Sequence, residues 1–183
     1  MDIARLCAGA GEVQFLAIIA VCVLCAVSYG VVHDQITARI CVEYFTIGHA
    51  PVFGTDDPTL LGLGWGVLAT WWVGVMLGIP LAVVARAGAW PKRSAVSLVR
   101  PLLILMIASA ACATIAGIAG WRLAGGGVVV LPEPLAGRVP PEKHVAFLAD
   151  AFAHSASYLI GFVGGGIVML VVWLQRRKAS VVG

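Results

Sequence analysis

The chain has 183 residues, of which 61% are hydrophobic and 11% charged, and its formal net charge is +3. A soluble domain carries about twice that charged fraction, so the composition excludes a soluble globular protein and indicates an integral membrane protein. The small positive charge gives no indication of nucleic-acid binding, because the basic residues lie at the ends of apolar stretches, where membrane topology accounts for them.

Four apolar stretches are long enough to cross a bilayer, which takes roughly 20 residues. We predict a helix for each, since backbone exposed to lipid must satisfy its own hydrogen bonds. The whole chain, 1–183, is therefore predicted to be a single integral membrane domain, with outer segments at 33–59 and 122–156. The predicted spans cover residues 13–32, 60–84, 102–121 and 157–174.

Basic residues predict the orientation, because Lys and Arg gather on the cytoplasmic side of membrane proteins. Most of them flank the side that both termini share. The expected fold is an all-α transmembrane four-helix bundle, N-in and C-in, with helices one and four extended on the outer side. The alternative for the first span, a signal peptide cleaved near Ser28, fits less well because the apolar run is longer than a usual h-region. The basic residues on the terminal side are Arg5, Arg86, Lys92, Arg93, Arg100, Arg176, Arg177 and Lys178.

The five cysteines offer no pair for a structural disulfide. Cys22, Cys25 and Cys112 lie inside predicted spans, Cys7 lies near the inner end, and Cys41 alone is on the outer side. Cys22 and Cys25 match the CxxC pattern of a quinone-linked thiol exchanger, but that chemistry needs a second cysteine pair in an outer loop. We therefore expect these thiols to pack as small apolar side chains.

Small residues recur every four positions in three of the predicted spans. Such rows let helix backbones approach closely, so they predict a compact bundle, or else contact with a second copy or another membrane protein. The rows are Gly62, Gly66, Thr70, Gly74 and Gly78; Ser109, Ala113 and Gly117; and Ser157, Gly161 and Gly165.

Imidazoles and carboxylates gather on the predicted outer side, whereas no ionisable residue lies deep in a span. The second fact argues against an ion-conducting or proton-pumping path. Four spans without a visible inverted repeat also argue against a secondary transporter. The outer groups are His33, His49, His144 and His154 together with Asp34, Glu43, Asp56, Asp57, Glu133, Glu142 and Asp150.

The first outer segment has no Gly or Pro before Gly48, so helix one is predicted to continue beyond the membrane surface. Arg39 and Glu43 lie four residues apart and are predicted to pair. Asp57 followed by Pro58 is typical of the start of the next helix.

In the second outer segment, Asp150 and His154 lie one helical turn apart on one face. They can bind one metal, the carboxylate can orient the imidazole, or the two can form a surface ion pair without a ligand. His33 and Asp34 are close enough to contribute if helices one and four are neighbours, as in up-down bundles.

The segment from Tyr29 to His49, YGVVHDQITARICVEYFTIGH, resembles one in uncharacterised bacterial four-span membrane proteins. The likeness extends through Pro58 and the Trp71-Trp72 pair and covers only part of the chain. The resemblance implies a multi-pass protein of the bacterial inner membrane, for which the distribution of Lys and Arg predicts both termini in the cytoplasm. It implies no activity, cofactor or partner.

Three hypotheses follow for function. The first is a metal site for zinc, iron or manganese on the periplasmic face, since mixed imidazole and carboxylate ligands suit these ions better than copper(I). The second is a non-enzymatic membrane subunit or scaffold whose outer polar residues form a hydrogen-bond network or bind a membrane partner. The third is haem b between His33 and His154, which needs opposed imidazoles. The predicted metal ligands are His33, Glu43, His49, Asp150 and His154.

Overall fold

The computed structural model describes residues 3–182, with side chains described for residues 11–181. Arg5 and Cys7, which enter the charge and cysteine counts above, have side chains outside that range. The chain is all α-helical, which confirms the predicted fold class. It folds into α1 (Ile3–Ile40), α2 (Val42–Thr46), α3 (Pro58–Leu68), α4 (Trp71–Arg86), α5 (Ala95–Gly125), a 3-10 turn η1 (Pro141–Lys143) and α6 (His144–Val182).

Four helical segments are long and apolar enough to cross a membrane, which confirms a multi-span membrane protein. They cover Gly11–Ile40, Pro58–Arg86, Ala95–Gly125 and Pro141–Val181. α1 has 38 residues and α6 has 39, far more than the roughly 20 that a bilayer needs. The predicted extension of helices one and four is therefore present.

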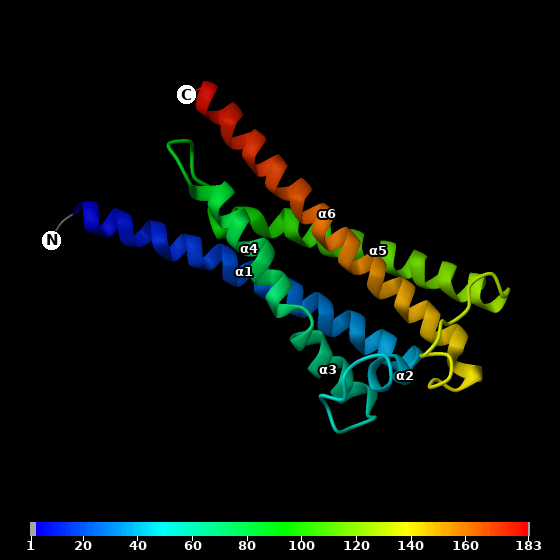
Figure 1. Ribbon diagram of the computed structural model, residues 1–183. Helices are drawn as coiled ribbons and strands as arrows, with labels where there is room; N and C mark the ends of the chain where they lie inside the picture. Colours follow the sequence, from blue (N-terminus) through cyan, green and yellow to red (C-terminus); the bar gives the residue numbers. More distant parts are fainter. Residues whose placement is uncertain (1–2, 183) are drawn as a thin grey trace.

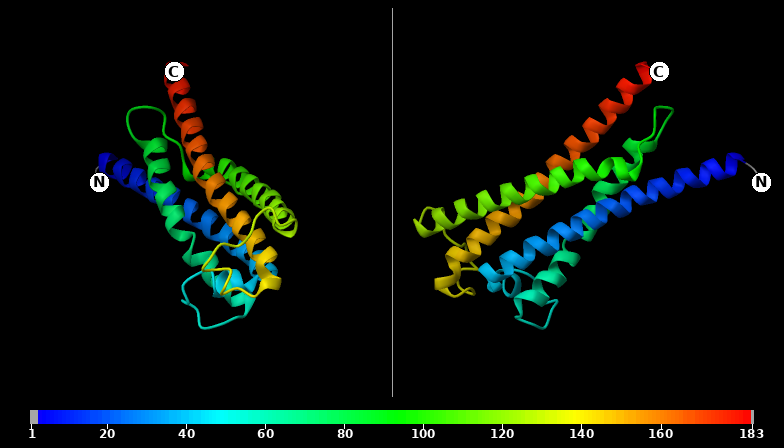
Figure 2. Two further views of the ribbon diagram at one scale, coloured as in Figure 1. Left: turned by 45° about the vertical axis from the view of Figure 1, so that its right-hand side comes forward. Right: turned by 180° about the vertical axis from the view of Figure 1, so that it is seen from behind.

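The helices pack as two pairs. α5 lies along α6, and α1 lies against α3 and α4, while α1 and α6 touch at few positions. Both termini lie at one end of the bundle, where α1 and α6 diverge (Figures 1 and 2). At the opposite end, α2, α3 and the start of α6 come together with the two long loops (Figure 1). This second end, called the loop end below, holds the candidate site.

The row of small residues on span two packs on α1. A Cβ added to Gly66 would lie 2.5 Å from Val31 Cα, and one on Gly74 would lie 2.5 Å from Val23 Cα. Thr70, in the same row, fills the space that Gly30 leaves open on α1. The backbones are thus in direct contact, as the four-residue spacing predicts. This row is used within the chain and is not available to a second copy.

Span two is not one continuous helix, contrary to the prediction. α3 ends at Leu68 and α4 begins at Trp71. The Thr70 hydroxyl donates to the Gly66 carbonyl, and the Tyr158 hydroxyl donates to the Ala69 carbonyl at 3.3 Å. Side chains thus take over backbone bonding at the break, which is how irregular backbone is tolerated at membrane depth.

Helix one also breaks earlier than predicted. Cys41 is extended, with φ −148° and ψ 97°, so Glu43 no longer follows Arg39 by one helical turn. The predicted Arg39–Glu43 pair is wrong: Arg39 donates to Thr59 Oγ1 at 2.8 Å, and Glu43 pairs with Lys143 at 3.5 Å. The predicted cap is confirmed, because the Asp57 carboxylate accepts from two backbone N–H groups of α3.

The cysteine prediction is borne out where side chains are described: Cys22, Cys25, Cys41 and Cys112 are all free. Cys22 is buried in the apolar core with Ile18 and Leu81. Its thiol packs as a small hydrophobic group.

One buried arginine holds the α4–α5 loop to α6 at the terminal end. Arg176 is 3% exposed. Its guanidinium donates to the carbonyls of Pro91 at 2.9 Å, Ala87 at 2.8 Å and Trp90 at 3.1 Å, and also to Val84. The planar fork of five donors suits a cluster of carbonyls from one loop. From the sequence, Arg176 was assigned only to topology.

We expect Gly66→Ala to destabilise the bundle, because the new methyl group would meet the backbone of α1. Overpacking of this kind costs about 1–3 kcal/mol, which a thermal unfolding curve in detergent will show as a lower midpoint. The matched control is Gly161→Ala, because a Cβ at Gly161 meets no atom within 4 Å. Equal midpoints for the two variants would contradict the assigned helix contact.

We expect Arg176→Ala to cost more than Arg177→Ala, because only the first removes a donor that four backbone carbonyls share. Hydrogen bonds to charged groups contribute about 1.5–3 kcal/mol each. Arg177 is exposed and lies 5.7 Å from the Trp173 ring centroid, a contact worth about 0.5–1 kcal/mol at exposed sites. Protease cleavage of the 87–94 loop should accelerate in Arg176→Ala alone. Unchanged cleavage there would show that the loop does not depend on the guanidinium.

Candidate metal centre

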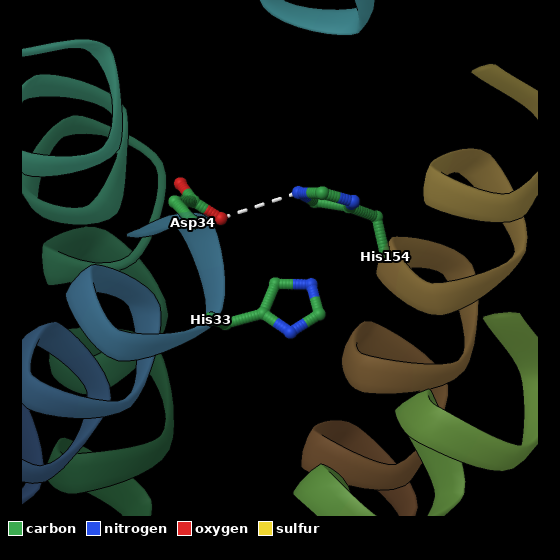
Figure 3. Close-up of side chains that lie close together, drawn as sticks. All are labelled: His33, Asp34 and His154. Atoms are coloured by element: carbon green, nitrogen blue, oxygen red, sulfur yellow. Dashed lines mark hydrogen bonds and ion pairs between the residues drawn. The ribbon is translucent and has the colours of Figure 1, made fainter. Parts of the chain in front are cut away.

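Two imidazoles and one carboxylate converge at the loop end of the bundle. His33 and Asp34 come from α1 and His154 from α6, and the three side chains point toward one another (Figure 3). Each offers one ligand atom, and these atoms all lie within 4.8 Å of one another. His154 Nε2 lies 3.2 Å from Asp34 Oδ1, and the two side chains are 11% and 6% exposed. These residues thus join α1 to α6, two helices that make few other contacts with each other.

The hydrogen bonds of His154 determine which ring nitrogen faces Asp34 with a lone pair. Nδ1 lies 2.8 Å from the Asp150 backbone carbonyl, which can only accept, so Nδ1 carries the hydrogen. In the neutral ring Nε2 is then an acceptor, and it faces a carboxylate oxygen. Two acceptors at this distance repel unless a proton or a cation lies between them.

His33 is the third member of the group. Its ring lies edge-on to His154, with centroids 4.5 Å apart, and stacks on Tyr29 at 5.6 Å. Its Nε2 is buried and has no hydrogen-bond partner in the described part of the chain. A buried ring nitrogen without a partner is costly, and in the tautomer that leaves Nε2 without a hydrogen it is free to bind a cation.

Aromatic residues enclose the site from the loop end. The Tyr44 ring stacks on His154, with centroids 4.5 Å apart. Burial raises the pKa of Tyr44, so its hydroxyl stays protonated at neutral pH. The Tyr29 hydroxyl and Ser157 Oγ lie 2.7 Å apart, a hydrogen bond that ties α1 to α6 one turn from His33.

Glu43, His49 and Asp150, the other predicted ligands, lie outside the three-residue group. Glu43 faces Lys143 and accepts from the Cys41 thiol at 3.4 Å. His49 donates through Nδ1 to the Tyr44 carbonyl at 2.9 Å, and its ring lies 4.6 Å from Trp65.

Asp150 reaches His154 through its backbone carbonyl alone, so the predicted carboxylate–imidazole contact is not made. His144 is half-buried, with Nε2 3.0 Å from the Val139 carbonyl. Cys41 offers no thiolate to the site at neutral pH, since burial raises its pKa to about 12.

Asp34 is the residue missing from the ligand set predicted from the sequence. It directly follows His33, so the two side chains leave α1 about 100° apart around the helix axis. The sequence alone does not show which of them turns toward α6. In the structure both do, and they face His154 from the α1 side (Figure 3).

A cavity of about 150 Å³ lies beside the three groups and continues between the helices toward the terminal end. His33, Asp34, His49 and His154 line its loop end, and apolar residues such as Leu81 and Met169 line its far end. A cavity of this volume holds a molecule of about the size of benzene. It leaves no room for a porphyrin, and the edge-to-face contact of His33 with His154 leaves none between the imidazoles.

No protein family, curated protein or solved structure matched the chain. The four long apolar helices confirm the multi-span part of the resemblance described above, and the family is not identified. The chemistry of the site therefore has to carry the functional argument.

Proposed function

We propose that this multi-span membrane protein binds one divalent transition metal through His33, Asp34 and His154. The observation that carries the proposal is the convergence of two imidazoles and one carboxylate, whose ligand atoms all lie within 4.8 Å of one another. A metal ion between them bonds to His154 Nε2 and Asp34 Oδ1, which are 3.2 Å apart. The positive-inside distribution of Lys and Arg supports a site on the outer face of a bacterial inner membrane.

The donor set suits a specific group of metals. Two histidines and one carboxylate are the ligands of hydrolytic zinc sites and of non-haem iron(II) sites with open positions. Zinc–nitrogen bonds measure about 2.0–2.1 Å, so two ligand atoms at the tetrahedral angle are about 3.4 Å apart. The ligand atoms of the three groups lie within 4.8 Å of one another, so metal binding requires the side chains to move closer together.

Surrounding groups support the same conclusion. The Asp150 carbonyl holds the His154 tautomer that leaves Nε2 free, which is the usual role of a partner behind a metal-bound histidine. Three protein ligands leave at least one coordination position for water or substrate, and the cavity adjoins it. A ligand role for Glu43, His49 or Asp150 stays a prediction.

The test is metal content of protein purified in mild detergent, loaded with zinc, iron(II) or manganese(II) under anaerobic conditions and freed of excess ion. We expect about one equivalent in wild type, because the site holds one ion. His33→Ala, Asp34→Asn and His154→Ala should each weaken binding by more than about 100-fold, since even a partner behind a ligand is worth roughly 10–100-fold.

The matched control is His144→Ala, which removes an imidazole outside the group. Glu43→Gln, His49→Ala and Asp150→Asn test the remaining predicted ligands in the same assay. Less than about 0.2 equivalents in wild type with every ion, against the single ion that a complete site binds, would contradict the proposal. So would full binding by His154→Ala.

A second candidate function is a non-enzymatic scaffold, favoured by the polar links between α1 or α2 and the α6 side of the bundle. These are His154–Asp34, Tyr29–Ser157 and Glu43–Lys143. If the protein is a scaffold, Asp34→Asn lowers its thermal stability and the wild type binds no metal ion. Metal content and thermal stability, measured together, therefore distinguish the scaffold from the metal-binding protein.

A further inference from the structure

A groove of about 520 Å³ runs between α1, α5 and α6, separate from the cavity beside the metal centre. Its outer walls are apolar: Val32 is 62% exposed, Ile36 58% and Ile118 57%. In a membrane-spanning bundle such side chains face the acyl chains of lipids. The groove is therefore open to the bilayer from the side.

A buried carboxylate lies in the inner wall of this groove. Asp150 is 1% exposed, and among the described residues neither Oδ1 nor Oδ2 has a hydrogen-bond partner. An isolated buried carboxylate is costly by several kcal/mol, and the great majority of buried polar groups are bonded. Neither oxygen has a donor, and both are covered by neighbouring atoms, so an amine in the groove bonds to them once the Asp150 side chain turns toward it.

The opposite charge lies at the rim of the same groove. Arg122 lines it, is exposed, and makes no ion pair with any described side chain. Trp121, beside it, also lines the groove and is 51% exposed. Tryptophan and arginine at the end of a span are typical of the headgroup level of a membrane.

The carboxylate lies at this same level of the bundle. A Cβ on Gly117 of α5 would lie 3.4 Å from Ala153 Cβ and 3.5 Å from the Ala149 carbonyl, and these two residues bracket Asp150 on α6. Asp150 is therefore level with the last turns of α5, close to the turn that carries Arg122. The groove therefore combines a buried hydrogen-bond acceptor, Asp150, with a cation at its rim, Arg122, and an apolar wall.

We infer that this groove binds a phospholipid with a primary amine in its headgroup, such as phosphatidylethanolamine. The ammonium donates to the two oxygens of Asp150, the phosphate pairs with Arg122, and an acyl chain lies along Val32, Ile36 and Ile118. The apolar wall favours a lipid over a free amine, because a water-soluble amine gains nothing from it. Choline lipids carry no N–H group, so they leave the Asp150 oxygens unbonded.

The experiment is native mass spectrometry of the purified protein with equimolar dioleoyl phosphatidylethanolamine and dioleoyl phosphatidylcholine. We expect the ethanolamine lipid to be retained roughly tenfold or more over the choline lipid, the size of effect given by charge-assisted hydrogen bonds. Asp150→Asn should abolish the preference. Arg122→Gln should weaken both lipids alike and leave their ratio unchanged, because both carry the phosphate.

The matched controls are Glu142→Gln and Arg138→Gln, which remove exposed charges outside the groove. Equal retention of the two lipids by wild type would overturn the inference, as would a preference that survives in Asp150→Asn. If Asp150→Asn fails to fold, a series of N-methylated ethanolamine lipids on wild type still decides, because retention must fall as N–H groups are lost.

The result is separable from the metal proposal. Asp150→Asn should keep its metal, since only the backbone carbonyl of Asp150 supports His154. Loss of the metal together with the lipid preference would place the carboxylate in the metal centre and overturn its assignment to the groove.

Discussion

The contact of Asp34 with His154 is the interaction on which the loop end of the bundle depends. It joins residues 120 positions apart on α1 and α6, two helices that touch at few other places. The two side chains are only 11% and 6% exposed, so each loses hydration that a shared proton or cation must offset. Because the second imidazole nitrogen is already bonded, a proton or a cation has to occupy the space between them. What occupies it therefore affects how α1 and α6 are held together.

The position of Asp34 is fixed by backbone contacts rather than by its own side chain. A Cβ on Gly62 would lie 2.9 Å from Gln35 N and 3.0 Å from the Asp34 carbonyl carbon, so α3 presses directly on the turn of α1 that carries the carboxylate. On the other side, Gly117 and Gly120 let α6 lie close to α5, which sets the rotation of the helix that carries His154. Small residues thus determine where the two charged groups meet.

The difference between local sequence rules and contacts between helices explains which features the sequence could predict. Spans, helix extensions, the Asp57 cap and the glycine row follow from local rules of hydropathy, capping and spacing, and each is present. The break at Cys41 and the turn at Thr70 depend on contacts between helices, so a pattern along one segment does not reveal them. His33 and His154 were predicted and do meet. Asp34 was considered beside His33 but is absent from the predicted ligand set, and its direction depends on the rotation of α1, which the contact with α3 influences.

Asp150 shows how one helical turn can serve two sites. Its backbone carbonyl fixes the imidazole of His154 on the metal side, and the residue also lines the groove. His33 lines both the cavity and the groove, so the proposed metal and lipid lie on either side of one imidazole. The metal side uses the backbone carbonyl of Asp150 and the lipid side uses its carboxyl group, so the two proposed ligands share one helical turn without sharing a contact. A shift of that turn changes both sites, and by linkage the coupling is the same in both directions.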